Sequence, residues 1–406
     1  MSPTDTNRSF KSFFDNILYN RSFATVLWFG LAFIGVVLEY AKSTGNNYLI
    51  FKGVFEHTIH QQNLYLAYPA EYGDYNHYGP VFSLVIAPFA LLPNWLGVVL
   101  WVMLNTAILY TAIRMLPIAE KWKNAILIFS AHEMMIAAEW MQSNAMIGAF
   151  IILGFVFITR GKEAWALFFI MLATFIKLYG VVGFAFFFFS KNRIKFIGWA
   201  IVWSVVFFLA PMLISTRAFI AQSYVDWFTE LRFKDLRNAR MDIRNDFQDI
   251  SVMGMIRRIF HYQALRNYFV TVPAMLLFAS QYLQFKYFND VRYRLYLLCS
   301  VLITTVIFTT SAESPTYIIA FPAVCIWFVL QPASRWATAF FIFALLLTSF
   351  SYSDIFTPYV REHLVRPYSL KALPCFLLWL ILLVQIWRKQ FLDVSLDKLN
   401  LKFANA

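Results

Sequence analysis

The chain of 406 residues is 60% hydrophobic and 19% aromatic, and only 14% of its residues are charged. This composition excludes a soluble globular protein, because apolar segments close to membrane-spanning length recur from Phe23 to Trp387. The net charge of +12 is typical of cytoplasmic loops that face anionic lipid in a protein with many membrane crossings, so we expect no nucleic acid as a partner.

Short loops rich in lysine and arginine define the predicted topology, because such loops stay in the cytoplasm. Seven basic groups occur along the chain, and placing all of them inside requires an even number of crossings between each group and the next. The segments that satisfy this lie near 23–40, 95–115, 124–140, 145–160, 195–214, 268–285, 295–311, 316–330, 336–350 and 370–388. The segment 163–190 has to cross twice, as two short helices that meet at Lys177–Gly180.

These segments predict an all-α polytopic membrane protein of about twelve transmembrane helices, with both ends in the cytoplasm. No internal repeat or soluble domain is visible, so residues 1–406 are expected to form a single transmembrane domain. Two longer segments, 40–79 and 215–266, are left as external loops. Between the first loop and the next span, the apolar run 80–92 is too short to cross, and Pro88 and Pro93 interrupt it. We expect a half-helix there that re-enters the membrane or lies along its outer surface.

The second external loop carries nine Lys or Arg against six Asp or Glu, which a long loop tolerates on the outside. Its segment Asp246–Phe260 has apolar residues along one helical face and Arg257 and Arg258 at one end. Two interpretations are open for this segment. It suits an amphipathic helix bound to acidic lipid, and it equally suits the capture of a lipid-linked phosphate by arginine.

The predicted topology sends polar residues from distant parts of the chain to the same external side. Ionisable groups near a membrane are costly and commonly mark function. The residues concerned are Asp74, His77, Gln142, Asn144, Lys177, Tyr179, Arg257, Arg258, Glu313 and Tyr317. Their convergence from separate loops indicates a common site at the outer surface.

Several of these residues also have a structural explanation. The tyrosines of the first external loop suit an aromatic belt at the membrane interface, and Asp74 suits a solvated turn. Gln142 and Asn144 suit the cap of the helix that follows them. His77 has no His or Cys at ligand spacing, so we expect no metal site. Lys177 is different, because a lysine within an aromatic and aliphatic run either reaches the surface or requires an anionic partner.

Five segments resemble, in the same order, the sequence blocks of the glycosyltransferase family 87 proteins. These segments are Tyr75–Asn105, Gln142–Asn144, Phe175–Gly180, Gln248–Arg258 and Glu313–Tyr317. The family consists of GT-C-type enzymes and includes polyprenyl-phosphate-mannose-dependent α-mannosyltransferases. The resemblance extends over residues 25–390 and implies a hexosyltransferase. Such an enzyme moves a hexose such as mannose, with inversion, from a polyprenyl-phosphate donor to a lipid or glycan acceptor on the external face.

The chain departs from the family pattern where the resemblance implies an acidic residue soon after the first span. Asn46 and Asn47 stand at that place. The resemblance therefore leaves two alternatives, another base or a loss of activity. Asp74 is the first candidate for the base, and the other acids available are Glu56, Glu39 and Glu313.

The mechanism that the resemblance implies requires a base for the acceptor hydroxyl and cations for the departing lipid phosphate. We expect Asp74 to be the catalytic base, and Lys177, Arg257 and Arg258 to bind the donor phosphate. The residues expected to bind the sugar or the acceptor are Asn46, Asn47, Tyr75, His77, Tyr78, Gln142, Asn144, Tyr179, Glu313 and Tyr317. The expected partners are the polyprenyl-phosphate sugar, the acceptor and membrane lipids, with no further cofactor. The expected location is the plasma membrane of a bacterium, with the active site on the periplasmic side.

Two other classes of protein share some of these features. A secondary transporter also has interrupted helices, but it usually carries inverted repeats and ionisable groups near the membrane centre. A flippase or lipid-binding scaffold would share the basic external loop and would not need Asp74. The charged residues of this chain are predicted at one outer edge, which favours the transferase.

Overall fold

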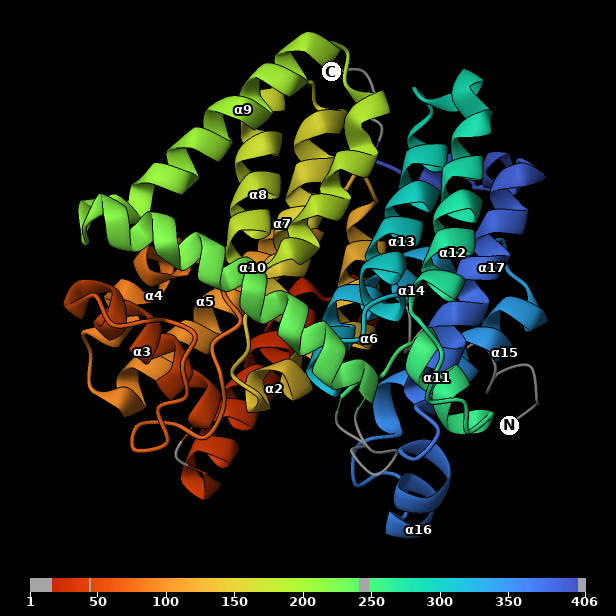
Figure 1. Ribbon diagram of the computed structural model, residues 1–406. Helices are drawn as coiled ribbons and strands as arrows, with labels where there is room; N and C mark the ends of the chain where they lie inside the picture. The colour runs from red at the N-terminus through yellow and green to blue at the C-terminus, as the bar shows by residue number, and fades with distance from the viewer. Residues whose placement is uncertain (1–16, 44, 241–247, 401–406) are drawn as a thin grey trace.

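The computed structural model describes residues 17–43, 45–240 and 248–400. Nearly all of these residues are helical, and the β-structure within these ranges is a single antiparallel bridge between Ile118 and Leu399. The predicted all-α class is therefore confirmed. Figure 1 shows the helices as one bundle, with α7, α8, α13 and α14 near its middle.

Each segment predicted to cross the membrane is helical. In chain order these helices are α2 (Arg21–Lys42), α5 (Asn94–Arg114), α6 (Glu120–Glu139), α7 (Asn144–Thr159), α8 (Glu163–Ile176), the 3-10 helix η1 (Leu178–Phe189), α9 (Arg193–Leu209), α12 (Tyr268–Ser280), α13 (Val291–Ile307), α14 (Tyr317–Leu330), α15 (Arg335–Ala344) and α17 (Leu373–Trp387). Four continuous helical stretches are long and apolar enough to cross a membrane, namely Arg21–Lys42, Asn94–Arg114, Arg193–Leu213 and Leu370–Trp387. The chain is thus a membrane protein, while the number of twelve crossings stays a prediction.

The predicted external loops contain helices of their own. The first holds α3 (Asn46–His60), which begins directly after Gly45. Gly45 has a φ of 70°, a left-handed conformation that glycine adopts without strain. The short α4 (Phe82–Ala90) follows at the place of the predicted half-helix and ends before Pro93. Its re-entry into the membrane stays a prediction.

The second predicted loop holds α10 (Arg217–Arg240) and α11 (Val252–Ile259). The latter lies within Asp246–Phe260, where an amphipathic helix was expected, although the first two residues of that segment fall outside the described ranges. In Figure 1, α10 lies across the front of the bundle. It packs on the chain that follows α3 through a small apolar cluster of Leu64, Tyr65, Ile220, Tyr224 and Trp227.

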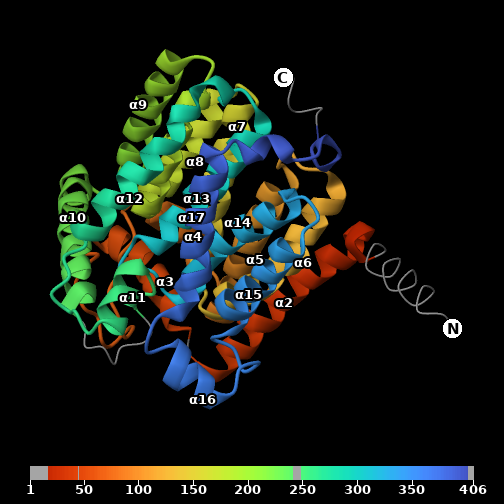
Figure 2. The same cartoon turned by 90° about the vertical axis from the view of Figure 1, so that its right-hand side faces the viewer.

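The segments predicted to be external lie toward one end of the molecule. Figures 1 and 2 show α3, α11 and the short α16 (Pro358–Val360) at the end opposite the C-terminus. Along the bundle, α2 packs against α6, α7 against α8, and α13 against α14. The chain therefore returns to this end between α6 and α7, between α8 and η1, and after α13, where the polar residues of interest lie.

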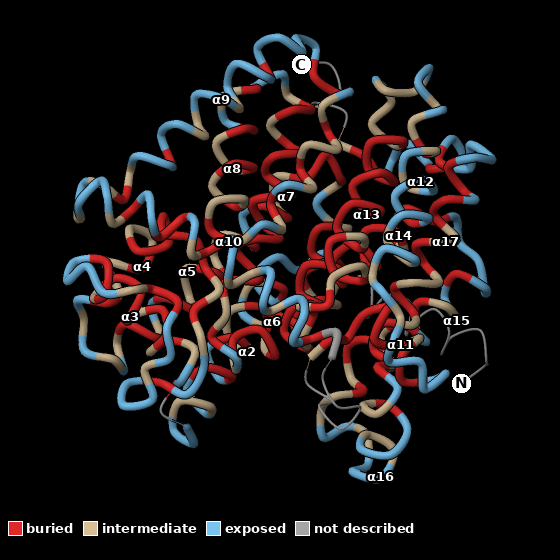
Figure 3. Tube along the Cα trace, viewed as in Figure 1, coloured by how far each residue is buried: buried red, intermediate tan, exposed pale blue. Residues whose placement is uncertain are grey.

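The distribution of buried residues is that of a membrane protein. Figure 3 shows α7, α13 and α14 to be largely buried, whereas α9, α10 and α12 are largely exposed. The exposed side chains of α9 and α12 are mostly apolar, among them Ile194, Ile201, Phe269 and Met275. Apolar surface of this extent requires a nonpolar surrounding such as lipid.

Candidate active site

A chain of hydrogen bonds connects four of the side chains that the sequence singles out. Lys177 Nζ donates to Asn144 Oδ1 at 3.0 Å, and Asn144 Nδ2 donates to Gln142 Oε1 at 2.6 Å. Gln142 Nε2 in turn donates to Glu313 Oε2 at 2.7 Å. The other oxygen of Glu313 accepts a hydrogen bond of 2.7 Å from Gln248 Nε2. The turns between α6 and α7, between α8 and η1, and after α13 thus meet at one polar network, which we call the Glu313 cluster.

Lys177 reaches this cluster because the helix breaks at its own position. Its backbone is extended, with φ −150° and ψ 126°, between the end of α8 and the start of η1. Its Nζ lies 4.6 Å from the ring centroid of Tyr179 and 5.7 Å from that of Tyr78. Aromatic faces attract an ammonium group, so the two rings hold the lysine at the cluster.

Tyr78 is brought to Lys177 by the glycine that follows it. Gly79 N donates to Ile176 O at 3.0 Å, and a Cβ at residue 79 would lie only 2.1 Å from Phe175 O. Glycine is therefore required for this approach of the first loop to the end of α8. The tyrosine itself is buried, and its hydroxyl accepts a hydrogen bond of 3.2 Å from Ser143 Oγ.

Two lysines share the one carboxylate of the cluster. Burial and the charge of Lys234 lower the pKa of Lys177 to about 7, and Glu313 opposes the shift. The pKa of Lys234 is also lowered by burial, against the pull of Glu313 and Asp74. Burial alone would raise the pKa of Glu313, but Lys234 and Lys177 outweigh it and hold this pKa below its usual value. The cluster therefore has cationic side chains for an additional anion.

Asp74 lies beside this cluster, on the loop between α3 and α4. Its turn is held by Asn46 Oδ1, which accepts a hydrogen bond of 2.7 Å from Gly73 N. The side chain of Asp74 is exposed, and its carboxylate acts electrostatically on both Lys234 and His77. This loop thus carries a solvent-accessible carboxylate to the edge of the Glu313 cluster.

Helix α10 supplies charged partners to the same loop. His77 Nδ1 lies 3.4 Å from Glu230 Oε1, and the guanidinium of Arg237 lies 4.8 Å from the ring centroid of Tyr75. The helix residues Glu230, Lys234 and Arg237 fall at positions i, i+4 and i+7 of α10, which places them on one face of that helix. None of these three helix residues was predicted as a site residue. Their spacing along a polar helix is the signal in the sequence that could have revealed them.

A polar cavity of about 370 Å³ opens next to Asp74. It is lined by Glu39, Ser43, Gly45, Asn46, Asn47, Asp74, Glu139, Trp140 and Met141. The two asparagines that replace the expected acid therefore share a cavity with two of the candidate bases, Asp74 and Glu39. The other two are engaged elsewhere, because Glu56 lies 3.7 Å from Lys52 on the surface of α3 and Glu313 belongs to the cluster.

On the other side of the cluster lies an apolar groove of about 580 Å³ between η1, α10, α12 and α13. Its walls are mostly aliphatic and aromatic, with Val181, Val182, Met275 and Phe278 among them. Its polar end is formed by Tyr179, whose hydroxyl donates to Ser311 O at 3.1 Å. Since Tyr179 also covers Lys177, the groove ends at the Glu313 cluster.

Arg257 and Arg258 are not brought to Lys177 by any described hydrogen bond. Arg257 Nη1 donates to Asp249 Oδ2 at 2.7 Å, and Arg258 Nη2 donates to Gln248 O at 2.7 Å. Both arginines are buried. They hold the segment before α11, and through it they position Gln248 against Glu313.

Tyr317 has a similar supporting position. It is fully buried, and its hydroxyl donates to Ile250 O at 2.9 Å. The backbone of the same segment is tied to the loop before Glu313, because Ile250 N donates to Ala312 O at 2.8 Å. Within the ranges that the structure describes, no group of three or more His, Cys, Asp or Glu side chains is arranged to hold a metal ion.

The model of glycosyltransferase family 87 matches residues 76–311 of the chain, which is more than half of its length. The resemblance seen in the sequence blocks is thereby confirmed. No curated protein and no solved structure was found to match the chain. The matched segment includes Gln142, Asn144, Lys177 and the whole of α10, while Asp74 and Glu313 lie two residues outside it on either side.

Proposed function

The chain belongs to glycosyltransferase family 87, and from this premise we propose that it transfers a hexose from a polyprenyl-phosphate donor to a lipid or glycan acceptor. Mannose is the sugar that the resemblance suggests. The reaction would take place on the external face of the membrane, which we assign to the periplasmic side of a bacterial plasma membrane.

The observation that carries this proposal is the position of Asp74 between the polar cavity and the lysines at the Glu313 cluster. On one side it lines the polar cavity with Asn46 and Asn47. On the other side it acts on Lys234, which flanks the Glu313 cluster together with Lys177. A base at such a border can reach an acceptor hydroxyl in the cavity while the donor phosphate is held by the lysines.

The donor would lie with its polyprenyl chain in the apolar groove and its phosphate at the polar end of that groove. Lys177 and Lys234 supply positive charge there, although burial lowers the pKa of both. A phosphodiester would favour the charged form of both lysines. The same cations would stabilise the charge that grows on the phosphate as the sugar departs.

The transfer itself would be a single displacement. The acceptor oxygen attacks the anomeric carbon as Asp74 removes its proton, and the bond between that carbon and the phosphate oxygen breaks. Because attack and departure occur on opposite faces of the carbon, the configuration inverts. Gln142, Asn144 and Glu313 would orient the sugar, and a fixed alignment of both substrates supplies much of the rate enhancement.

Reconstituted protein tests this function directly. Liposomes that contain the full chain, a host lipid extract and polyprenyl phosphate carrying radiolabelled mannose or glucose should form a new labelled lipid or glycan. Movement of the labelled donor across the bilayer without a new glycosidic bond would identify a flippase or transporter instead. Retention of all label in an unmoved donor would contradict both.

A further inference from the structure

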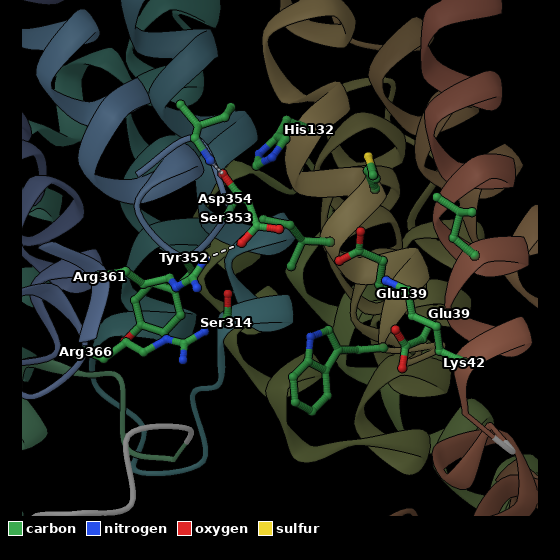
Figure 4. A pocket seen from close by; sticks show the side chains of 15 residues that line it. Glu39, Lys42, His132, Glu139, Ser314, Tyr352, Ser353, Asp354, Arg361 and Arg366 are labelled. Carbon is green, nitrogen blue, oxygen red and sulfur yellow. Dashed lines mark hydrogen bonds and ion pairs between the residues drawn. The ribbon is translucent and has the colours of Figure 1, made fainter. Parts of the chain in front are cut away.

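A second polar cavity, of about 580 Å³, lies between the ends of α2 and α6 and the segment around α16 (Figure 4). Its size is within the usual range for small-ligand sites. It is lined by Leu38, Glu39, Lys42, His132, Met135, Ile136, Glu139, Trp140, Ser314, Tyr352, Ser353, Asp354, Ile355, Arg361 and Arg366. Charged side chains in such number are not expected around a cavity that only results from imperfect packing, because each charge has to be kept hydrated or paired.

The charges of this cavity are separated in space. Figure 4 shows Glu39, Lys42 and Glu139 on one side and Tyr352, Arg361 and Arg366 on the other. Glu39, Glu139 and Trp140 also line the cavity that contains Asp74. The acidic side therefore adjoins the proposed base, and the arginines lie at the far side.

One of these arginines, Arg361, has a donor without a partner among the described residues. The side chain of Arg361 is only 13% exposed, yet its carboxylate partners Asp354 and Glu362 are 98% and 50% exposed. The Nε of Arg361 is buried and has no hydrogen-bond partner among the described residues. A buried guanidinium that is paired with exposed, hydrated carboxylates can exchange them for a ligand oxyanion at small cost, since arginine presents a planar fork of donors.

Arg366 lies close by, with its guanidinium 5.6 Å from the ring centroid of Tyr352. The wall behind these residues is rigid, because Lys371 Nζ donates to Ser314 Oγ at 3.1 Å and is itself paired with Glu133. Ser314 directly follows Glu313, so this wall is continuous with the cluster that would hold the donor.

We propose that this cavity is the acceptor site and that the acceptor is a hydroxyl-rich molecule bearing an oxyanion. Its reacting hydroxyl would lie at the Asp74 side, where Glu39 and Glu139 accept hydrogen bonds from neighbouring hydroxyls. Its phosphate or carboxylate would be bound by Arg361 and Arg366. This inference rests on the proposed function, which leaves the class of acceptor open.

The test uses full-length protein in liposomes with the radiolabelled polyprenyl-phosphate donors. The host lipid extract is separated by anion exchange into neutral and anionic fractions, and each is offered as acceptor. We expect label to enter the anionic fraction. Cold hydrofluoric acid treatment of that fraction before the assay distinguishes the sources of the oxyanion, because it cleaves phosphodiesters and leaves carboxylates intact.

Arg361→Gln combined with Arg366→Gln should raise the KM for the anionic acceptor by roughly tenfold or more, with kcat and donor binding unchanged. Arg361→Lys keeps the positive charge but loses the planar fork of donors, so it should raise the KM by a smaller factor. This variant serves as the test if the double variant folds poorly. Arg335→Gln, at an exposed arginine outside the lining of the cavity, is the matched control. Equal transfer to the neutral fraction, or an unchanged KM in the arginine variants, would overturn the inference while leaving the transferase intact.

A binding measurement separates this inference from the proposed function. Trp140 lines the cavity. The part of the tryptophan fluorescence quenching that disappears in Trp140→Phe therefore reports occupancy of the cavity without turnover. Glycerol 3-phosphate or glucuronate should cause saturable quenching that Arg361→Gln weakens. If no fraction accepts label and this quenching is still seen, the transferase proposal fails and the oxyanion site stands; if neither probe binds, the site is refuted.

Discussion

Lys371 Nζ lies 2.9 Å from Glu133 Oε1, and neither side chain has any exposed surface. The pair joins the short 3-10 helix before α17 to the middle of α6, across a large separation in sequence. Lys371 also donates to Ser314 Oγ at 3.1 Å. This single ammonium group therefore fixes the turn that carries Glu313, and it holds Ser314, which lines the second cavity.

Replacement of one partner should destabilise the protein severely. Lys371→Met leaves the Glu133 carboxylate buried without its cation, and such a loss typically costs about 3–5 kcal/mol. Thermal unfolding in detergent should show a large drop in Tm. The double variant Lys371→Met with Glu133→Gln should recover much of it, because no buried charge is left. Equal stability of the single variant and the wild type would contradict the importance of this pair.

Asp74→Asn should abolish transfer while the protein stays folded. The side chain is exposed and forms no ion pair with any other described residue, so the isosteric amide should leave Tm unchanged. Loss of a general base commonly lowers the rate by about 100-fold or more. The measurement is the initial rate of labelled product at saturating donor.

The matched control for Asp74 is Glu56→Gln, an acid on neighbouring α3 that faces Lys52. It should retain full activity. A loss of transfer in Glu39→Gln together with normal rates in Asp74→Asn would move the base to Glu39, which lines the same cavity.

Donor binding should weaken as the pH rises through about 7. The pKa of Lys177 is lowered to about 7 by burial, so its ammonium form is dominant below that pH and is lost above it. The phosphodiester of the donor keeps one charge over this range, and its affinity should therefore fall above neutrality. Titration of a nonhydrolysable donor analogue from pH 6 to 8.5 measures the effect.

Lys177→Arg supplies the control, because a guanidinium stays charged throughout this range. Its donor affinity should vary little with pH, even if the affinity itself is lower. An identical pH dependence in both proteins would assign the titration to another group, of which Lys234 is the nearest candidate because burial lowers its pKa too.

The sequence could predict the helices and part of the site, because hydrophobic length and basic loops report on the membrane directly. It also singled out Gln142, Asn144, Lys177 and Glu313, since each is a polar residue at the end of an apolar run. It did not reveal Lys234 or the pairing of Lys371 with Glu133. The spacing along α10 could have placed Lys234 on a charged face, but which helices become neighbours is not encoded in any local pattern.

The expected role of Arg257 and Arg258 illustrates the same limit. Two adjacent arginines at the end of an amphipathic helix are typical of phosphate binding as well as of structural pairing. Only the fold shows that their donors are directed to Asp249 and to the backbone of Gln248. A basic motif therefore gives the type of partner, an oxygen, without showing whether that oxygen belongs to a ligand.

Narrowing the apolar groove should weaken donor binding in a manner that depends on the length of the polyprenyl chain. Val181→Trp places a bulky side chain on the wall of the groove at a position that is 52% exposed, where it can be accommodated without refolding of the core. Long-chain donors should lose affinity, and donors with one or two prenyl units should be affected less. Competition between donors of different length measures this.

Val205→Trp is the matched control, because Val205 is also 52% exposed and lies on α9, outside the lining of the groove. Both variants add the same apolar surface to the protein. If they reduce donor affinity equally, the loss reflects the added tryptophan and the groove does not hold the lipid chain.

Gly79→Ala should disrupt the site without touching any of its functional groups. A Cβ at this position would lie 2.1 Å from Phe175 O and 2.9 Å from the ring of Trp227, so the loop has to move away from the end of α8. Overpacking of this kind typically costs about 1–3 kcal/mol. Because Tyr78 precedes Gly79 and covers Lys177, the displacement should reduce donor affinity as well as Tm. Gly198→Ala on α9 has no atom within 4 Å of the added Cβ and should leave both quantities unchanged. Normal donor affinity in Gly79→Ala would show that Lys177 is held by its cluster alone, without the aromatic cover of the first loop.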